Sequence, residues 1–270
     1  MIKDITIGQY FPGSSVSHRL DPRTKILMTV AYIVILFLAK NLFSLAVGAI
    51  FTIIAYAVSR VPLKMILKSL KPIIPIALFT AILNLFFIDG RVLFEFWVIR
   101  VTYEGIVTAA LLVIRIILLI AGSSLLTYVT SPITLTDGIE SLFSPLNKIK
   151  VPVHELAMMM TIALRFIPTL IEETDKIMSA QKARGADIET GGLIKRAKAL
   201  VPILIPLFVS AFRRADELAL AMECRCYRGG EGRTKLRKLR YGGADLVAAG
   251  ITLVLAAATL LVNYYAPAIL

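Results

Sequence analysis

Residues 105–136 read GIVTAALLVIRIILLIAGSSLLTYVTSPITLT, and Arg115 is the one charged residue among these 32 positions. A helix needs about 20 mostly apolar residues to cross the roughly 30 Å hydrocarbon core of a bilayer. As a helix the whole stretch would reach about 48 Å, because each residue rises about 1.5 Å. The stretch therefore predicts a membrane-spanning helix with an arginine inside it.

Four further uncharged runs predict four more spans. The shortest, residues 26–39, is bordered by Lys25 and Lys40. Such side chains extend their ammonium groups to the two interfaces while their stems stay in apolar surroundings, so we count this run as spanning. The four runs are Ile26–Ala39, Asn41–Ser59, Pro72–Ile88 and Leu246–Leu270.

The remaining uncharged run, Ala199–Phe212, is interpreted differently. It has 14 residues and would reach about 21 Å as a helix. Pro202 and Pro206 also remove two backbone donors from it. We expect this run to lie at the membrane surface or inside the protein.

The composition agrees with lipid as the main solvent. Hydrophobic residues make up 57% of the 270-residue chain, charged residues 18%, and the mean hydropathy is +0.79. A soluble domain is about a quarter charged, so a soluble enzyme is excluded. Cys224 and Cys226, the two cysteines, are separated by one residue and cannot form a disulfide framework. We predict an all-α integral membrane protein with about five spans and a cytoplasmic region of long helices.

The distribution of cations predicts how the chain crosses the membrane. With five spans, 26 of the 30 Lys and Arg fall in residues 1–25, 59–71 and 129–243. Cytoplasmic loops retain such an excess of positive charge. We therefore expect a multi-pass protein of the cell membrane with a cytoplasmic N-terminus and the C-terminus outside.

Residues 131–243 are predicted to form a cytoplasmic region between membrane regions 1–130 and 244–270. Apolar positions recur at spacings of three and four from residue 153 to residue 184, which is typical of one helical face. A second long helix is expected from Leu200 to about Arg225. At an offset of 41, four positions of the first helix match four of the second: Asp175, Ile177, Ala180 and Arg184 with Asp216, Leu218, Ala221 and Arg225.

In both copies the arginine lies at the end of the helical pattern. Gly185 follows the first copy directly, and Gly229 lies shortly after the second. Glycine permits the left-handed conformation of a helix cap, and the helix dipole favours a cation there. The two helices are either simply capped, or they present Arg184 and Arg225 to pockets of a partner, which a guanidinium can anchor.

These residues resemble a known family, the transmembrane T component of energy-coupling factor (ECF) transporters. The likeness rests on Leu20–Lys25 (LDPRTK) and on two short X-Arg-X motifs about forty residues apart, and it covers essentially the whole chain. The motifs are Ala183-Arg184-Gly185 and Cys224-Arg225-Cys226. The second departs from the commoner Ala-Arg-Gly, which puts the packing of small residues around Arg225 in doubt.

The resemblance implies a coupling subunit of an ABC-type importer. Its two long cytoplasmic helices would insert their tips into grooves of two ABC-type ATPases. A membrane-embedded substrate-binding S component would sit against it, and members of the family take up vitamins or nickel and cobalt ions. On this reading the protein is not an enzyme, and the six residues of the two motifs are its ATPase-docking residues.

Arg115 leaves two interpretations open. An ionisable group within a span is expensive unless paired, so Arg115 is a candidate intramembrane functional residue. Alternatively it is part of the architecture, either because the span is shifted so that Arg115 lies nearer one interface or because it contacts a polar neighbour such as Asn84.

Other site types have little support. The chain has no P-loop motif for nucleotide, and His18 and His154 lack metal-ligand spacing with the cysteines, so we expect no catalytic, cofactor or metal site. The basic stretch Arg233–Arg240 favours anionic lipid headgroups over nucleic acid. A permease with its own substrate path remains an alternative, and a membrane-embedded enzyme a weaker one.

Overall fold

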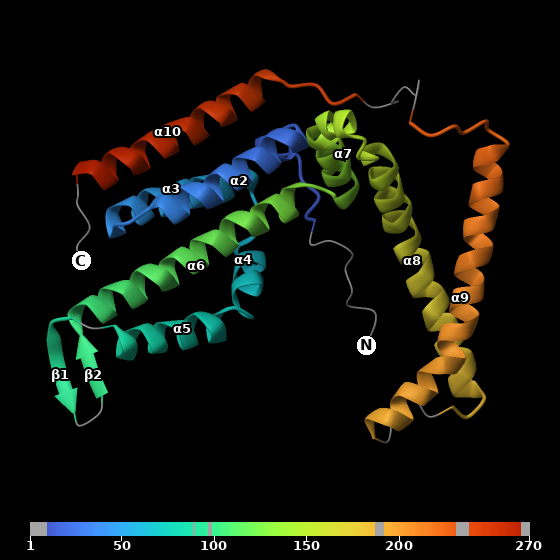
Figure 1. Cartoon of the computed structure of the whole chain (residues 1–270), viewed down its shortest axis with the longest axis horizontal. Coiled ribbons are helices and arrows are strands. Elements are labelled where there is room, and N and C mark those ends of the chain that lie inside the picture. The colour runs from blue at the N-terminus through green and yellow to red at the C-terminus, as the bar shows by residue number, and fades with distance from the viewer. Residues whose placement is uncertain (1–9, 89, 97–98, 187–191, 231–237, 266–270) are drawn as a thin grey trace. The chain divides into compact units, whose positions relative to one another are not determined.

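The computed structural model describes residues 10–88, 90–96, 99–186, 192–230 and 238–265 (Figure 1). The described elements are α1 (Val16–Arg19), α2 (Pro22–Leu38), α3 (Leu42–Ser59), α4 (Leu63–Leu70), α5 (Ile74–Phe87), β1 (Val92–Phe96), β2 (Ile99–Thr102), α6 (Tyr103–Val129), α7 (Pro132–Phe143), a 3₁₀ helix (Ser144–Ile149), α8 (Val153–Ala183), α9 (Leu193–Glu223) and α10 (Gly243–Tyr265).

The chain divides into two compact units, each with its own internal packing. The first, here called the helical bundle, comprises Gln9–Gly138 and Lys238–Leu270. The second, the crossed-helix unit, comprises Ile139–Arg237.

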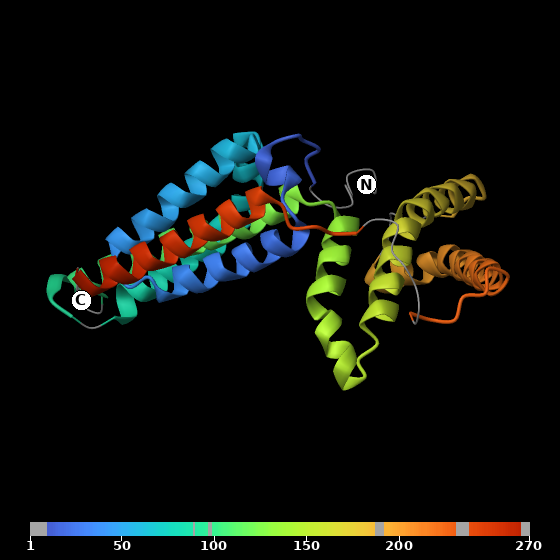
Figure 2. The same cartoon turned by 90° about the horizontal axis from the view of Figure 1, so that it is seen from above.

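Helix α6 is the centre of the bundle. Helices α2, α3, α4 and α5 all pack against it, and α10 packs on α2 and α3 (Figures 1 and 2). The core forms where these helices meet, because their apolar faces exclude both water and lipid there. Its buried members include Tyr32, Leu36, Leu45, Leu118 and Leu255.

A glycine allows α2 and α6 to approach closely. A Cβ atom added to Gly122 would lie 2.2 Å from Cε1 of Tyr32, inside van der Waals contact. The Tyr32 hydroxyl in turn forms a 2.5 Å hydrogen bond with Thr52 of α3. The small residues of α6 therefore serve helix packing within this chain.

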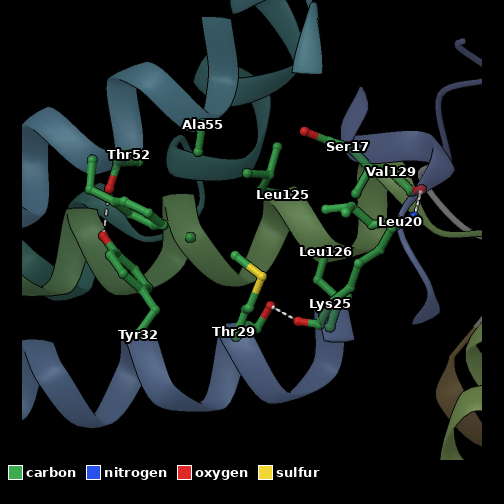
Figure 3. Close-up of a pocket in the computed structure, with 13 residues that line it drawn as sticks. Ser17, Leu20, Lys25, Thr29, Tyr32, Thr52, Ala55, Leu125, Leu126 and Val129 are labelled. Carbon is green, nitrogen blue, oxygen red and sulfur yellow. Dashed lines mark hydrogen bonds between the residues drawn. The ribbon is translucent and has the colours of Figure 1, made fainter. Parts of the chain in front are cut away.

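A cavity of about 110 Å³ lies between α2, α3 and α6 (Figure 3). The Tyr32–Thr52 pair closes one end, and Lys25 and Leu20 lie at the other. The ammonium group of Lys25 donates to the carbonyl oxygens of Val129 at 3.0 Å and His18 at 3.1 Å. Most of the remaining lining is apolar, so this cavity offers few groups that could recognise a polar solute.

Within the described residues, four helices are long and apolar enough to cross a bilayer: α3, α6, α8 and α10. Helices α4 and α5 meet at a bend of 54° and together would supply a fifth span. The expected third span, Pro72–Ile88, is thus a 14-residue helix, α5, preceded by the short α4. The chain is a multi-pass helical membrane protein.

The first expected span is α2, which has 17 residues and begins at Pro22 rather than Ile26. Asp21 explains the earlier start, because its carboxylate accepts a 2.9 Å hydrogen bond from the backbone N–H of Arg23, and proline is favoured in the first turn. At about 25 Å, α2 is nearly long enough to cross the hydrocarbon core.

A short antiparallel hairpin, β1–β2, joins α5 to α6 and is the described departure from an all-helical fold. Thr102 ends the hairpin and begins α6, since its hydroxyl accepts a 3.1 Å hydrogen bond from the N–H of Gly105.

Helix α8 spans the residues that the periodicity predicts, but α9 differs from expectation. It begins at Leu193 instead of Leu200 and continues through Pro202 and Pro206. The run Ala199–Phe212 is therefore the middle of a 31-residue helix. Of the two expected positions, the interior of this chain is wrong, since most of the run's apolar side chains are exposed, including Ile205 and Phe208. The membrane surface stays a prediction.

Candidate functional site

The tip of α8 has the hydrogen-bond pattern of a Schellman cap. The N–H of Gly185 donates to the carbonyl of Lys182 at 3.0 Å, and the N–H of Ala186 donates to that of Gln181 at 3.0 Å. Gly185 has a φ of 86°, the left-handed conformation that this cap requires. Arg184 is the cap residue itself.

The tip of α9 repeats this geometry residue for residue. The N–H of Cys226 donates to Glu223 at 2.8 Å, and that of Tyr227 to Met222 at 3.0 Å. Cys226 takes the left-handed position with a φ of 55°, so Arg225 directly precedes the left-handed residue as Arg184 does in α8. The two copies related by the 41-residue offset thus share backbone conformation as well as sequence. A side chain in this conformation costs about 1 kcal/mol, whereas glycine adopts it freely.

Both motifs are open to the surroundings. All six of their residues are exposed: Ala183, Arg184, Gly185, Cys224, Arg225 and Cys226. Among the described residues, neither Arg184 nor Arg225 forms a side-chain hydrogen bond or ion pair. Two cations are therefore presented by rigid backbone caps.

The two helices cross at equivalent positions of the repeat. Glu173 of α8 accepts a 2.8 Å hydrogen bond from Arg214 of α9, and its other carboxylate oxygen accepts one from Ser210. Glu173 and Arg214 are separated by 41 residues, the offset that relates the two copies. This pair therefore lies on the approximate two-fold axis of the crossed helices.

The crossing places the two arginines symmetrically. Arg184 lies eleven residues after Glu173, and Arg225 lies eleven after Arg214; each is thus about 16 Å beyond the crossing point. The helices run in opposite directions, because the α8–α9 contacts pair residue 173 with 210 and residue 181 with 202. The two tips consequently project away from each other (Figure 1).

A tertiary contact explains how α9 tolerates its prolines. Pro206 has no N–H, so the carbonyl of Pro202 lacks its usual helical donor. Gln181 of α8 supplies one, its side-chain amide donating to that carbonyl at 3.3 Å. The sequence analysis missed this contact and the partners of Glu173; the only signal was the 41-residue separation of Glu173 and Arg214.

Arg115 caps the end of another helix. Its guanidinium donates to the carbonyl oxygen of Ala39 at 2.5 Å. Ala39 is the C-cap of α2, where carbonyl groups lack helical partners and a cation is favoured. Asn84 is not its partner, since its amide donates to Thr80 within α5.

The Leu20–Lys25 motif joins three helices. Asp21 binds Arg23 through both carboxylate oxygens, and its backbone N–H donates to Asp245 of α10 at 2.8 Å. Lys25 reaches Val129 at the end of α6. Burial raises the pKa of Asp21, but the hydrogen bonds and charge of Arg23 outweigh it, so its pKa lies below the ordinary value. The largely buried motif therefore has a structural role, which is to hold the ends of α2, α6 and α10 together.

The described residues contain no cluster of three metal-ligating side chains. Cys224 and Cys226 are free thiols. The histidines are engaged elsewhere, His18 with Ser15 and His154 with Glu140. Of the basic stretch Arg233–Arg240, residues 233–237 lie outside the described residues.

A bundle of candidate membrane-spanning helices, joined to a crossed pair of long, arginine-tipped helices, defines a multi-pass helical membrane protein. The family model of CbiQ, a cobalt transport protein, matches residues 13–236. The chain is 54% identical to the energy-coupling factor transporter transmembrane protein EcfT of Ruminiclostridium cellulolyticum, covering 98% of this chain and 99% of that protein. The corresponding EcfT proteins of Thermosediminibacter oceani and Bacillus subtilis are 57% and 50% identical, covering 92% and 95% of this chain and 93% and 97% of theirs. The chain therefore belongs to the CbiQ family, as a transmembrane component of the ECF transporters, and is not an enzyme.

Proposed function

We propose that the tips of α8 and α9 dock into two ABC-type ATPase subunits, with Arg184 and Arg225 as the anchors. The observation that carries the proposal is that both arginines occupy the same position of the same backbone cap. Equivalent tips fit equivalent pockets, and tips that project in opposite directions cannot share one pocket. A pair of similar subunits meets both conditions.

The crossed helices would act as levers. When the two ATPases close on ATP, their grooves move, and a helix transmits such a displacement with little internal deformation. The Glu173–Arg214 pair would hold the crossing point while the tips move. The motion would reach apolar side chains that this chain leaves exposed on α8, among them Leu156, Met159 and Met160.

A membrane-embedded S component is the partner we propose for these apolar faces. Exposed apolar residues on α9 extend the same type of surface: Val201, Leu204, Ile205, Phe208 and Phe212. Exposed apolar side chains on helices outside the lipid need a cover. A shifted contact there would release the vitamin or metal-ion solute that the S component carries.

We propose that α2, α3, α4–α5, α6 and α10 are the spans, with the N-terminus cytoplasmic and the C-terminus outside the cell membrane. Helix α8 is long enough to span, but Glu172, Glu173 and Asp175 lie in its second half, where charge in hydrocarbon would be costly. Helices α8 and α9 then lie together on the cytoplasmic side.

Charge reversal at both tips tests the docking. The chain with Arg184→Glu and Arg225→Glu, co-expressed with the ATPases and purified in mild detergent, should lose the ATPases while remaining in the membrane. Anchor residues at interfaces contribute about 2 kcal/mol or more each, so the double reversal should weaken the association by at least about 100-fold. Each single reversal should weaken it less.

The matched control is Arg165→Glu with Arg213→Glu. Both of these arginines are exposed on the same two helices but away from the tips, and the change in net charge is the same. This variant should retain the ATPases. Undiminished recovery of ATPases with the tip variant, or equal loss with both variants, would show that the tips are not the anchors.

A further inference from the structure

A second hollow in the helical bundle lies where the N-terminal segment meets the end of α3. Its lining includes Ser14, Ser15, Arg19, Ala57, Val58 and Arg60, and its volume is about 580 Å³. Helix α1 packs on α3 here, and the Ser59 hydroxyl donates to that of Ser17 at 2.9 Å. The hollow is therefore part of the folded bundle.

The charge in this hollow is entirely positive among its described lining residues. Arg19 and Arg60 are both exposed, and neither forms a side-chain hydrogen bond or ion pair with a described residue. Two guanidinium groups offer planar sets of donors that match phosphate oxygens. The exposed Ser14 can add a hydroxyl donor.

The hollow lies at the end of a membrane span. Arg60 directly follows Ser59, the last residue of α3. In the final turns of α3, Ile53, Ile54 and Val58 are 68%, 56% and 46% exposed, as expected of side chains that face lipid. A basic hollow at the point where an apolar helix ends lies at the depth of phospholipid headgroups.

The backbone at Arg60 ends α3 in a left-handed conformation. Arg60 has a φ of 53° at the C-cap of α3, a conformation usually occupied by glycine or asparagine. Lys150 and Cys226 take the same conformation at the ends of other helices, so it marks the end of the helix. Arginine there meets the cap geometry at an energetic cost and adds a cation to the hollow.

We propose that this hollow binds the phosphate of an anionic phospholipid, with Arg19 and Arg60 as its ligands. The lipid is favoured over a soluble phosphate because the lipid-facing end of α3 adjoins the hollow and Val16 and Val58 border it. The proposal does not depend on the docking of the α8 and α9 tips.

Native mass spectrometry of the full chain, purified in detergent and titrated with phosphatidylglycerol, tests the site. Juxtamembrane cations contribute about fivefold each to anionic lipid binding, so Arg19→Gln with Arg60→Gln should weaken retention by about 30-fold. Lys64→Gln with Lys68→Gln removes the same charge from the neighbouring exposed face of α4 and should leave retention nearly unchanged. Equal loss in the two variants would overturn a specific site.

Two further measurements test whether the hollow itself binds the lipid and whether its ligand is a lipid or a soluble phosphate. Ala57→Trp keeps both arginines but fills the hollow, and it should also lower retention of phosphatidylglycerol; unchanged retention would overturn the proposal. Glycerol 3-phosphate should compete poorly. Should it displace the lipid at equal concentration, the ligand would be a soluble phosphate and not a phospholipid.

Discussion

Cys226 stands where the first copy of the cap has glycine, and its backbone is left-handed in the same way. Replacing it by glycine removes the steric penalty on the side chain. We expect Cys226→Gly to stabilise the last turn of α9 by about 0.5–1 kcal/mol. Hydrogen exchange at the amides of Cys226 and Tyr227 measures the change directly, because both donate to the cap.

Cys224→Gly is the matched control for that prediction. Cys224 has a right-handed helical backbone with φ −60°, so glycine there should loosen the turn by about 0.5–1 kcal/mol. Changes of the same sign in the two variants would mean that the left-handed strain is not what distinguishes the positions.

Gly122 tests how tightly α2 and α6 are packed. The ring of Tyr32 cannot retreat easily, since it is stacked on Phe51 with ring centroids 5.6 Å apart and its hydroxyl is bonded to Thr52. We expect Gly122→Ala to destabilise the bundle by about 1–3 kcal/mol through overpacking. Thermal unfolding in detergent should show a lower Tm.

Gly250→Ala provides the comparison, because nothing lies within 4 Å of the Cβ it would add in α10. Its Tm should stay equal or rise slightly, as alanine is the better helix former. A Tm loss as large as that of Gly122→Ala would point to helix–lipid effects of alanine instead of the Tyr32 contact.

At the scale of helices, Arg115 joins the middle of α6 to the end of α2. We expect Arg115→Met to leave the Ala39 carbonyl without its donor and to destabilise the bundle by about 1–2 kcal/mol. Faster hydrogen exchange confined to the last turn of α2 is the diagnostic measurement. Arg115→Lys, which keeps a cationic donor, should restore part of the protection.

The competing interpretation of Arg115 makes a different prediction. If the residue serves transport directly, Arg115→Met would keep the wild-type Tm and exchange pattern but abolish coupled ATP hydrolysis in the assembled transporter. The Ala39 contact favours the architectural role.

The helices also show which parts of the fold can be predicted from sequence. Hydrophobic periodicity locates α8 to within a residue, because its apolar positions repeat without a strong breaker before Gly185. It misplaces the start of α9, because Lys195, Arg196 and Lys198 interrupt the apolar pattern before Leu200. It also gives no account of the Pro202 carbonyl, which Pro206 leaves without a helical donor. The compensating donor, Gln181, comes from another helix, and a pairwise tertiary contact leaves no local pattern.

The candidate site, too, can be predicted only in part from the sequence. The arginines and the 41-residue offset are visible in sequence because they repeat. The left-handed Cys226 is not, since cysteine carries no preference for that conformation. Arg115 could be recognised as exceptional from its apolar surroundings, but its partner is a backbone carbonyl, which every residue possesses.

At the scale of the whole molecule, the positive charge of the proposed loops and the position of α8 together predict on which side of the membrane the tip of α9 and the C-terminus lie. With α8 outside the bilayer, Cys224 and Cys226 lie on the cytoplasmic side, and they are the chain's two cysteines. If α8 crossed instead, the tip of α9 would move to the opposite side and α10 would return the C-terminus to the cytoplasm. The natural thiols thus report the topology.

Cys224 and Cys226 are both exposed. A membrane-impermeant maleimide should therefore label them in inside-out vesicles but not in intact cells. The chain is expressed without the ATPases, which could shield the tip of α9. A thiol-free chain (Cys224→Ser, Cys226→Ser) with Tyr264→Cys, at a position 80% exposed near the end of α10, should show the reverse. A membrane crossing by α8 would invert both results together. Labelling of the natural cysteines in intact cells, with labelling of Tyr264→Cys only in vesicles, would therefore place α8 in the membrane. Labelling of both probes from one side would require an even number of crossings between them, which contradicts α10 as the single span after the tip.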